Sequence, residues 1–442
     1  MSNQTRKFKG GVHPDDSKAL SKDKSIQEAP LLESYKVIMH QNIGAPPELV
    51  VKKGDTVKKG DLLAKAGGFV SVPLHAPTSG TVKMIDKCPG PTGMNVPSIE
   101  ITSDGEDEWG APFVPIADWQ NSDPKMLKQR VWDAGIVGMG GAGFPAHVKL
   151  SPPEGKTIDT LILNGAECEP YLTADHRLML EQAEEVVLGA AIIARILGLE
   201  TAVIGVENNK PDAIQALEKV ASKHNVKVQG LPVNYPQGAE KQLIYAITGR
   251  EVPIGKLPMD VHCVVQNVAS AVAVAEAVVK GRPSIERVTT ITGKCVVNPG
   301  NWRLRLGTPV EKALELVGGV SEQPAKLLLG GPMMGIAQSS LGVTVMKNTS
   351  GILLISRDEV SQYSSDPCIR CGRCVEVCPM NILPATISQA VENKRFDWAE
   401  ELNVMACIEC GSCSYVCPSR RPLNQHFKRA KIEIQAELRK KK

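Results

Sequence analysis

Aromatic residues and long apolar runs are both scarce in this sequence. Phe, Trp and Tyr make up 4% of the 442 residues, so we expect hydrophobic cores built from Ala, Val, Ile and Leu. The best candidate for a membrane span, VASAVAVAEAVV at 268–279, contains Glu276 and is shorter than the roughly 18 apolar residues that a bilayer requires. The first residues also lack the apolar core of a signal peptide. These absences predict a cytoplasmic chain with no transmembrane segment of its own.

The sequence also lacks a large excess of charge of either sign. Lys and Arg number 51 against 48 Asp and Glu, which gives a net charge of +3 and argues against nucleic acid as a main partner. The hydrophobic share of 42% and the charged share of 22% are ordinary for folded protein. The length is sufficient for three or four domains.

Eight of the twelve cysteines lie in two nearly identical runs, CIRCGRCVEVCP at 368–379 and CIECGSCSYVCP at 407–418. Each run has the spacing C-x2-C-x2-C-x3-C-P, which is typical of bacterial ferredoxins that bind [4Fe–4S] clusters. In a reducing cytoplasm, clustered thiols more often bind metal than form disulfides. A pair of zinc knuckles is the alternative, but zinc sites usually take two separated cysteine pairs rather than four thiolates within eleven residues.

In this ferredoxin pattern the fourth cysteine of each run ligates the other cluster, which explains why the run is repeated. Gly372 and Gly411 fit the pattern, since a side chain there would obstruct the approach of backbone amides to sulfide. We therefore assign cluster one to Cys368, Cys371, Cys374 and Cys417, and cluster two to Cys407, Cys410, Cys413 and Cys378.

A glycine-rich stretch, GIVGMGGAGFPAHVKL at 135–150, lies upstream. It follows an amphipathic helical pattern rather than a strand, which argues against an ordinary dinucleotide-binding fingerprint. Its backbone amides can still bind a phosphate, with Lys149 to neutralise charge.

Short apolar runs alternate with helical patterns after this loop. LILN, TAVIGV at 201–206 and KVQGLPV predict buried strands, with a helix from about Asp175 to Leu197 and another opening at Pro211. This alternation predicts a parallel sheet with a ligand crevice at the carboxyl ends of its strands, where Asn164, Glu167 and Glu169 would lie. For any one of these side chains, a cap or turn role is the equal alternative.

The motifs GGAGFP and NGAECEP resemble those of the flavin- and nicotinamide-binding subunit of respiratory complex I. The whole chain, including FKGGVHP at 8–14, NGAECEPYLTADHR and YPQGAEKQLI, closely resembles the RnfC (also called RsxC) component of the Rnf ion-translocating electron-transport complex. Carried over position by position, the resemblance implies an FMN site and an NADH site, with Glu167 beside the isoalloxazine, Phe144 stacking on NADH and Glu169 binding it. The implied FMN contacts are Gly138, Gly140, Gly141, Gly143, Lys149, Asn164 and Asn267, with Glu240 matching a further acid of the relatives.

Two departures bear on the nicotinamide site. Ala166 replaces the first acid of the N-A-D-E motif, and LSPP replaces the aromatic residue that contacts the adenine in complex I. We expect NADH to be held differently here.

The resemblance also implies a multidomain α/β and α+β architecture of four modules. They are a barrel-sandwich hybrid at 1–115, a Rossmann-like FMN/NADH domain at 120–283, a β-grasp (SLBB) module at 284–356, and an α-helical ferredoxin-type 2[4Fe–4S] domain with a basic C-terminal helix at 360–442. The first module resembles lipoyl domains, but its tip, GGFVSV, lacks the modifiable lysine and predicts a structural role. We expect Met333, Met334 and Met346 to fill a core. The basic C-terminal helix either packs on the cluster domain or docks on acidic lipid or a membrane partner.

A nicotinamide site and iron–sulfur clusters need a further cofactor between them. NADH gives up two electrons as hydride, whereas iron–sulfur clusters accept one at a time, so a flavin is needed between them. The resemblance implies a peripheral subunit on the cytoplasmic side of the inner membrane that passes electrons between NAD(H), FMN and two clusters. Its partners would be integral membrane subunits and a ferredoxin-reactive iron–sulfur subunit, without nucleic acid. The alternatives are an electron-relay scaffold without a nicotinamide site and a diaphorase-type subunit of a soluble enzyme.

Overall fold

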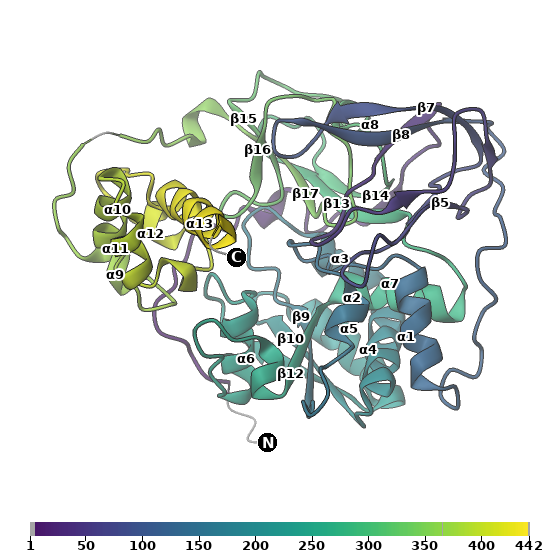
Figure 1. Ribbon diagram of the computed structural model, residues 1–442, viewed down its shortest axis with the longest axis horizontal. Helices are drawn as coiled ribbons and strands as arrows, with labels where there is room; N and C mark the ends of the chain where they lie inside the picture. The colour runs from purple at the N-terminus through teal and green to yellow at the C-terminus, as the bar shows by residue number, and fades with distance from the viewer. Residues whose placement is uncertain (1–4, 365, 441–442) are drawn as a thin grey trace.

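The structure is a computed structural model that describes residues 5–364 and 366–440. Strand-rich modules and a layered α/β module lie together, and a small helical module follows them at the C-terminal end (Figure 1). None of the described helices combines the length and apolar composition that a membrane crossing needs.

The first module is made of two small antiparallel sheets that enclose a core of Val, Leu, Ile and Ala. Phe69, in the predicted tip, packs edge-on against Trp132 and His147, with ring centroids 6.1 and 5.5 Å away. The tip therefore anchors this module to the α/β module. Its strands are β2 (Ser34–Ile38), β8 (Asn95–Ser103), β7 (Gly80–Pro89) and β4 (Thr56–Val57) in one sheet, and β3 (Glu48–Leu49), β5 (Leu62–Lys65) and β6 (Leu74–His75) in the other.

The second module is a parallel four-stranded sheet with the order β11-β10-β9-β12, covered by helices on both faces. The predicted strands are confirmed as β9 (Thr160–Gly165), β10 (Ala202–Glu207) and β11 (Val226–Leu231), and β12 (Cys263–Asn267) completes the sheet. One face packs against α1 (Pro124–Asp133), α2 (Ala146–Lys149), α4 (Ala183–Leu197), α5 (Pro211–Ala221) and α7 (Val268–Val279), and the other against α6 (Glu240–Thr248).

The single helix predicted from about Asp175 to Leu197 is wrong. The chain forms α3 (Ala174–Glu181) and α4, with a break at Gln182, where φ is −129° and ψ is 37°. Both helices contact α5, but after the break the packing differs, because α3 also contacts β13 (Glu286–Thr292) and β1 (Ile26–Glu28) whereas α4 packs mainly on α7. Apolar periodicity alone does not reveal that change of partner.

The third module is a six-stranded mixed sheet with the order β1-β14-β13-β17-β15-β16 and one helix, α8 (Val310–Leu316). Its edge strand β1 comes from the N-terminal segment and pairs in parallel with β14 (Gly300–Arg305). Met346 is buried as predicted, but Met334 is 47% exposed, so the prediction that it fills a core is wrong. The remaining strands are β15 (Lys326–Leu329), β16 (Ile336–Gln338) and β17 (Gly351–Ile355).

The C-terminal module is helical and lies at one side of the molecule (Figure 1). Its core contains cysteines of both runs and one face of the last helix, where Phe427, Ala430 and Ile434 are buried. The basic C-terminal helix thus packs on the cluster domain. The helices are α9 (Arg373–Glu376), α10 (Pro384–Glu392), α11 (Phe396–Glu401), α12 (Ser412–Tyr415) and α13 (Leu423–Lys440).

Candidate functional site

The glycine loop presents free backbone donors. Among the described residues, the N–H groups of Gly140, Gly141 and Ala142 donate to no protein acceptor, and all three residues are exposed. The loop itself is held firmly, since Met139 N donates to Ser270 Oγ at 3.0 Å and Asn348 Nδ2 donates to the Gly141 carbonyl at 2.6 Å. Successive free N–H groups on a fixed loop are suited to bind an anionic oxygen.

The predicted asparagines lie side by side at the carboxyl ends of neighbouring strands. In the parallel register of β9 and β12, Asn164 stands opposite Asn267. Asn164 Nδ2 donates to the Gly238 carbonyl at 2.8 Å, and Asn267 Nδ2 donates to Asp175 Oδ2 at 2.7 Å. A side chain on Gly140 would approach the Asn267 amide to 3.2 Å, which places the glycine loop directly over β12.

Lys149 and Glu240 form an ion pair of 2.7 Å beside these strand ends. Lys149 Nζ also donates to the Val265 carbonyl at 3.1 Å. Both side chains keep about a third of their surface exposed, at 27% and 36%, so the ammonium group can reach a further anion. The fold thus brings Lys149, Glu240, both asparagines and the loop to one edge of the sheet.

These groups fit FMN by their chemistry. Free loop amides and an ammonium group suit a phosphate, and two carboxamides suit ribityl hydroxyls. The buried Gln266 side chain of β12 has neither its oxygen nor its nitrogen hydrogen-bonded within the described residues, so this strand end holds further polar capacity. Phe144 is half-buried at the end of the loop, where its carbonyl oxygen accepts from Gly138 N at 2.8 Å.

The two glutamates of the ECEP segment (residues 167–170) are engaged within the protein. The Glu167 carboxylate accepts from the N–H groups of Asp175 at 2.6 Å and His176 at 3.2 Å, in the first turn of α3. Glu169 accepts from Met333 N at 3.1 Å and Met334 N at 2.9 Å. Burial raises the pKa of Glu169 to about 7, against the opposing effect of these hydrogen bonds. The roles predicted for these two residues, at flavin and NADH, stay predictions.

Two buried lysines that sequence reasoning missed hold the ECEP segment in place. Lys18 Nζ donates to the carbonyls of Glu167 and Glu169 at 3.0 and 2.9 Å, and Lys210 Nζ donates to the Ala166 carbonyl at 2.7 Å. Burial lowers the pKa of Lys18, and the Glu167 carboxylate opposes that effect. Lys18 follows the FKGGVHP motif closely, but nothing in its sequence spacing points to a segment about 150 residues away.

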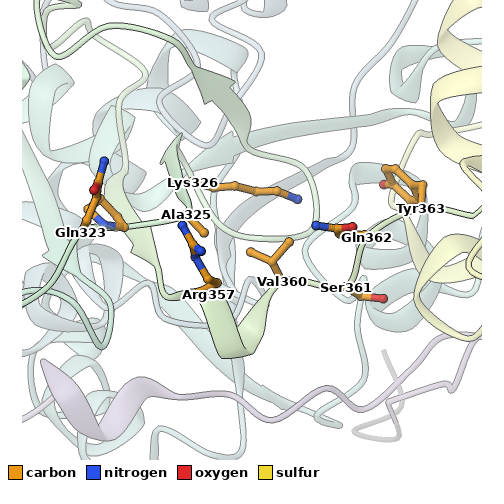
Figure 2. A pocket seen from close by; sticks show the side chains of 9 residues that line it. Gln323, Ala325, Lys326, Arg357, Val360, Ser361, Gln362 and Tyr363 are labelled. Carbon is orange, nitrogen blue, oxygen red and sulfur yellow. The ribbon is translucent and has the colours of Figure 1, made fainter.

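A pocket of about 660 Å³ lies elsewhere, at the edge of the β-grasp sheet (Figure 2). Its lining includes Lys326 from that module, and Arg357 and Tyr363 from the connection to the cluster domain. None of the predicted FMN or NADH residues contributes to it, so it is separate from the strand-end site.

The two cysteine runs adopt the same backbone conformation. Arg370 and Glu409 have φ of 56° and 57°, and Gly372 and Gly411 have φ of 80° and 78°. This left-handed turn directs the N–H of Arg370 to Cys368 Sγ at 3.4 Å and that of Glu409 to Cys407 Sγ at 3.3 Å. Amides turned towards cysteine sulfur are suited to stabilise thiolates that ligate a cluster.

The electrostatic neighbours of the thiols fall into two groups. Burial raises the pKa of Cys374, and nearby Cys368, Cys417 and Cys371 raise it further. Burial likewise raises the pKa of Cys413, and here the thiol neighbours are, in order of effect, Cys407, Cys410, Cys378 and Cys374. The fourth cysteine of each run thus lies near thiols of the other run, Cys417 beside Cys374 and Cys378 beside Cys413.

Cys410 joins the second group to the α/β module. It packs in a cluster with Val12 and Tyr235, to which Cys168 is also close, and the Tyr235 hydroxyl donates to the Cys410 carbonyl at 2.8 Å. Cys168 Sγ accepts from Gly238 N at 3.2 Å, and Gly238 is also the partner of Asn164. A continuous set of contacts therefore runs from the strand-end site to the second cysteine group.

Four family models match the chain in the order of its modules. They are the RnfC barrel sandwich hybrid domain at 6–106, the Nuo51 FMN-binding domain at 131–276, the SLBB domain at 288–337 and the 4Fe-4S dicluster domain at 361–418. The predicted fold class is confirmed. Among solved structures, a chain of an NAD+-reducing [NiFe]-hydrogenase superposes with a TM-score of 0.52 at 20% identity, over 72% of this chain and 64% of that one, which indicates a shared fold.

Curated relatives match over nearly the full length. The RnfC component of the proton-translocating ferredoxin:NAD(+) oxidoreductase complex of Clostridium ljungdahlii is 48% identical over 98% of this chain and 94% of its own length. Its counterpart in the Na(+)-translocating complex of Acetobacterium woodii is 45% identical over 98% of both chains. The counterpart in the ion-translocating oxidoreductase complex of Rhodobacter capsulatus is 44% identical over 97% of this chain and 83% of its own length. The chain belongs to the RnfC family of ion-translocating oxidoreductase complexes.

Proposed function

We propose that this chain is the electron-transfer subunit of an ion-translocating ferredoxin:NAD oxidoreductase complex in which NAD(H), FMN and two [4Fe–4S] clusters exchange electrons. The observation that carries the proposal is the continuous set of contacts from Asn164 through Gly238, Cys168 and Tyr235 to Cys410. It connects a site suited to FMN with a site suited to a cluster. Both kinds of domain are matched by family models in this chain.

The residues have distinct roles in this proposal. The N–H groups of Gly140, Gly141 and Ala142, with Lys149, hold the FMN phosphate, and Asn164 and Asn267 orient the ribityl chain. FMN supplies the step between two-electron hydride transfer and one-electron transfer. The proposed ligand sets have Cys417 and Cys378 exchanged between the runs, and the proximity of each to thiols of the other run supports this exchange.

Glu169 is the proposed contact for nicotinamide. Its carboxylate is already hydrogen-bonded within the protein, so nicotinamide binding requires a change in those contacts. The turn at Met333 and Met334 donates to both of its oxygens, and a side chain on Gly331 would lie 2.3 Å from Glu169 Oε2. Binding of NADH by this carboxylate therefore needs the turn between β15 and β16 to move away. The alternative is a relay subunit in which the turn stays closed and no nicotinamide binds.

We also propose membrane partners and a location for this chain. The names of the relatives describe complexes that translocate protons or sodium ions, and the described helices contain no membrane span. We infer that integral membrane subunits carry the ion path, and that this chain is peripheral, on the cytoplasmic side of the inner membrane.

The test is anaerobic. The chain is reconstituted with iron, sulfide and FMN, and its visible spectrum is recorded while NADH is added. Bleaching of the flavin band together with loss of cluster absorbance supports the proposal. FMN that binds but ignores NADH, while dithionite reduces the clusters, would favour the relay. A Glu169→Gln variant should keep FMN and react more slowly with NADH; unchanged kinetics would remove Glu169 from the nicotinamide site.

A further inference from the structure

The first cysteine run exposes the same face that the second run buries. Cys368 and Cys371 are exposed, whereas Cys410 is 7% exposed and Cys407 is partly buried. The neighbouring isoleucines differ in the same way, since Ile369 is 65% exposed and Ile408 packs against the cluster of Val12 and Tyr235. Because the two runs share one backbone conformation, their equivalent faces can be compared directly.

In the second run this face is already an interface. A side chain at Gly411 would lie 3.0 Å from the Met333 carbonyl, and the backbone oxygen of Cys410 accepts from the Tyr235 hydroxyl. At Gly372, the equivalent position of the first run, a side chain would meet nothing within 4 Å. The repeat thus places one cluster against the α/β module and leaves the other open to a second contact.

Three arginines belong to the open face or to the segment that follows Cys417. Arg370 stands where the second run has Glu409, which pairs with Lys431 at 2.8 Å, and Arg373 stands where the second run has the buried Ser412. Arg420 follows Cys417 by three residues. These three arginines are exposed, and within the described residues their guanidinium groups form no hydrogen bond or ion pair.

Glu376 is the one acid of the first run, and it lies at the end of α9. Asp366, two residues before Cys368, is a second exposed acid. The open face therefore has an apolar centre, Ile369, with three arginines and two acids around it. That combination is typical of surfaces that dock a partner, with the apolar centre excluding water and the charged rim steering the encounter.

We propose that this open face (Ile369, Arg370, Arg373 and Arg420) docks an acidic redox protein, one whose own cofactor edge is ringed by carboxylates. The proposal rests on the proposed function, because it requires a cluster held by Cys368, Cys371, Cys374 and Cys417. One electron passes between the partner's cofactor and this cluster, so that one is oxidised as the other is reduced, with no bond formed and no proton transferred. Cluster two then connects this entry point to the α/β module.

The experiment measures how fast an acidic 2[4Fe–4S] ferredoxin, reduced and freed of dithionite, reduces the clusters of the reconstituted chain. We expect the second-order rate constant to fall steeply as salt rises from about 20 to about 300 mM, because the charges are solvent-exposed. The double variant Arg370→Glu with Arg373→Glu should lower the rate at low salt by about tenfold or more and flatten the salt dependence. Glu is native at the position equivalent to 370, so the left-handed turn tolerates it.

The matched control carries the same kind of charge reversal elsewhere. Lys219→Glu with Lys227→Glu alters exposed residues of α5 and β11 in the α/β module, and its rate should stay near that of the parent chain. Equal slowing by both double variants, or no slowing by either, would overturn the proposal. The milder double variant Arg370→Gln with Arg373→Gln is used if charge reversal causes loss of the cluster, and its iron content is measured. This variant should still react more slowly with ferredoxin than the parent chain, and a parent-like rate would count against the proposal.

A lipid contact is the competing use of these arginines. Binding of the arginine variants to phosphatidylglycerol vesicles is measured in parallel. If the reversal abolishes vesicle binding and leaves the ferredoxin rate unchanged, the face is a membrane contact and the proposal is wrong. NADH takes no part in this assay, so failure of nicotinamide chemistry is read separately, from the bleaching experiment.

Discussion

The hydroxyl of Tyr235 donates a hydrogen bond of 2.8 Å to the backbone carbonyl of Cys410, 175 residues further along the chain. The same oxygen lies 3.4 Å from Glu169 Oε1. One side chain thus touches the ECEP segment at the strand ends and the second cysteine run at once. This contact fixes the distance between the two proposed redox sites.

Replacing Tyr235 by Phe should change one cluster selectively. The variant leaves the Cys410 carbonyl without its donor, and loss of a hydrogen bond near a cluster ligand makes reduction less favourable. We expect the midpoint potential of cluster two to become more negative while that of cluster one is unchanged, as measured by a redox titration followed by EPR. Equal shifts at both clusters would show that the effect is a general loosening of the module.

Exchange of the fourth ligand between runs predicts which cluster each cysteine supports. Cys417→Ser should damage the cluster of Cys368, Cys371 and Cys374, lowering iron from roughly eight to roughly four atoms per chain. Cys378→Ser is the matched variant and should damage the other cluster. EPR of the two proteins distinguishes the remaining centres. If Cys417→Ser lost only the cluster of its own run, the ligand assignment would be wrong.

Lys149→Met should weaken FMN binding. The ammonium group is the cation beside the free loop amides, and loss of a charge-assisted hydrogen bond costs about 1.5–3 kcal/mol, or roughly tenfold or more in the dissociation constant. The measurement is flavin fluorescence quenching on titration of the apoprotein. Lys156→Met is the control, because Lys156 also forms an ion pair, with Asp260, but at the opposite end of β9. Normal affinity in Lys149→Met would exclude Lys149 from the site.

Lys347 predicts a pH dependence of stability. Its ammonium group is fully buried where three modules meet and donates to the carbonyls of Pro73 at 3.0 Å and Gly135 at 2.6 Å, with burial lowering its pKa to about 7 from 10.5. Between these two pKa values the unfolded chain binds more protons than the folded one, so stability should rise with pH, by at most about 1.4 kcal/mol per pH unit.

The measurement is urea unfolding at about pH 7 and about pH 9, in the parent chain and in Lys347→Met. The variant should lose this rise, whereas Lys219→Met, at an exposed position, should keep it. The same slope in parent and Lys347→Met would show that the rise comes from other groups.

Local sequence patterns were sufficient to predict the cluster motifs and the parallel sheet of this protein. The repeated cysteine spacing predicted two clusters because ligand geometry is encoded within twelve residues, and the alternation of apolar runs and helices predicted the parallel sheet because each element is recognised by its own period. Position-by-position resemblance placed Asn164, Asn267, Lys149 and Glu240 as candidates for one site, and tertiary structure brings them to one sheet edge.

Only tertiary structure decided the contacts between segments far apart in sequence. Three features depend on which surfaces meet in the fold: the break of the helix at Gln182, the position of Lys18 beneath the ECEP segment and the burial of Lys347. The local periodicity of the sequence does not predict them. The same holds for the cysteine runs: nearly equal sequences adopt equal turns, yet one is packed against Tyr235 and the other faces solvent. The physical reason is that ligand spacing is a local property of the backbone, whereas burial is a property of the whole fold.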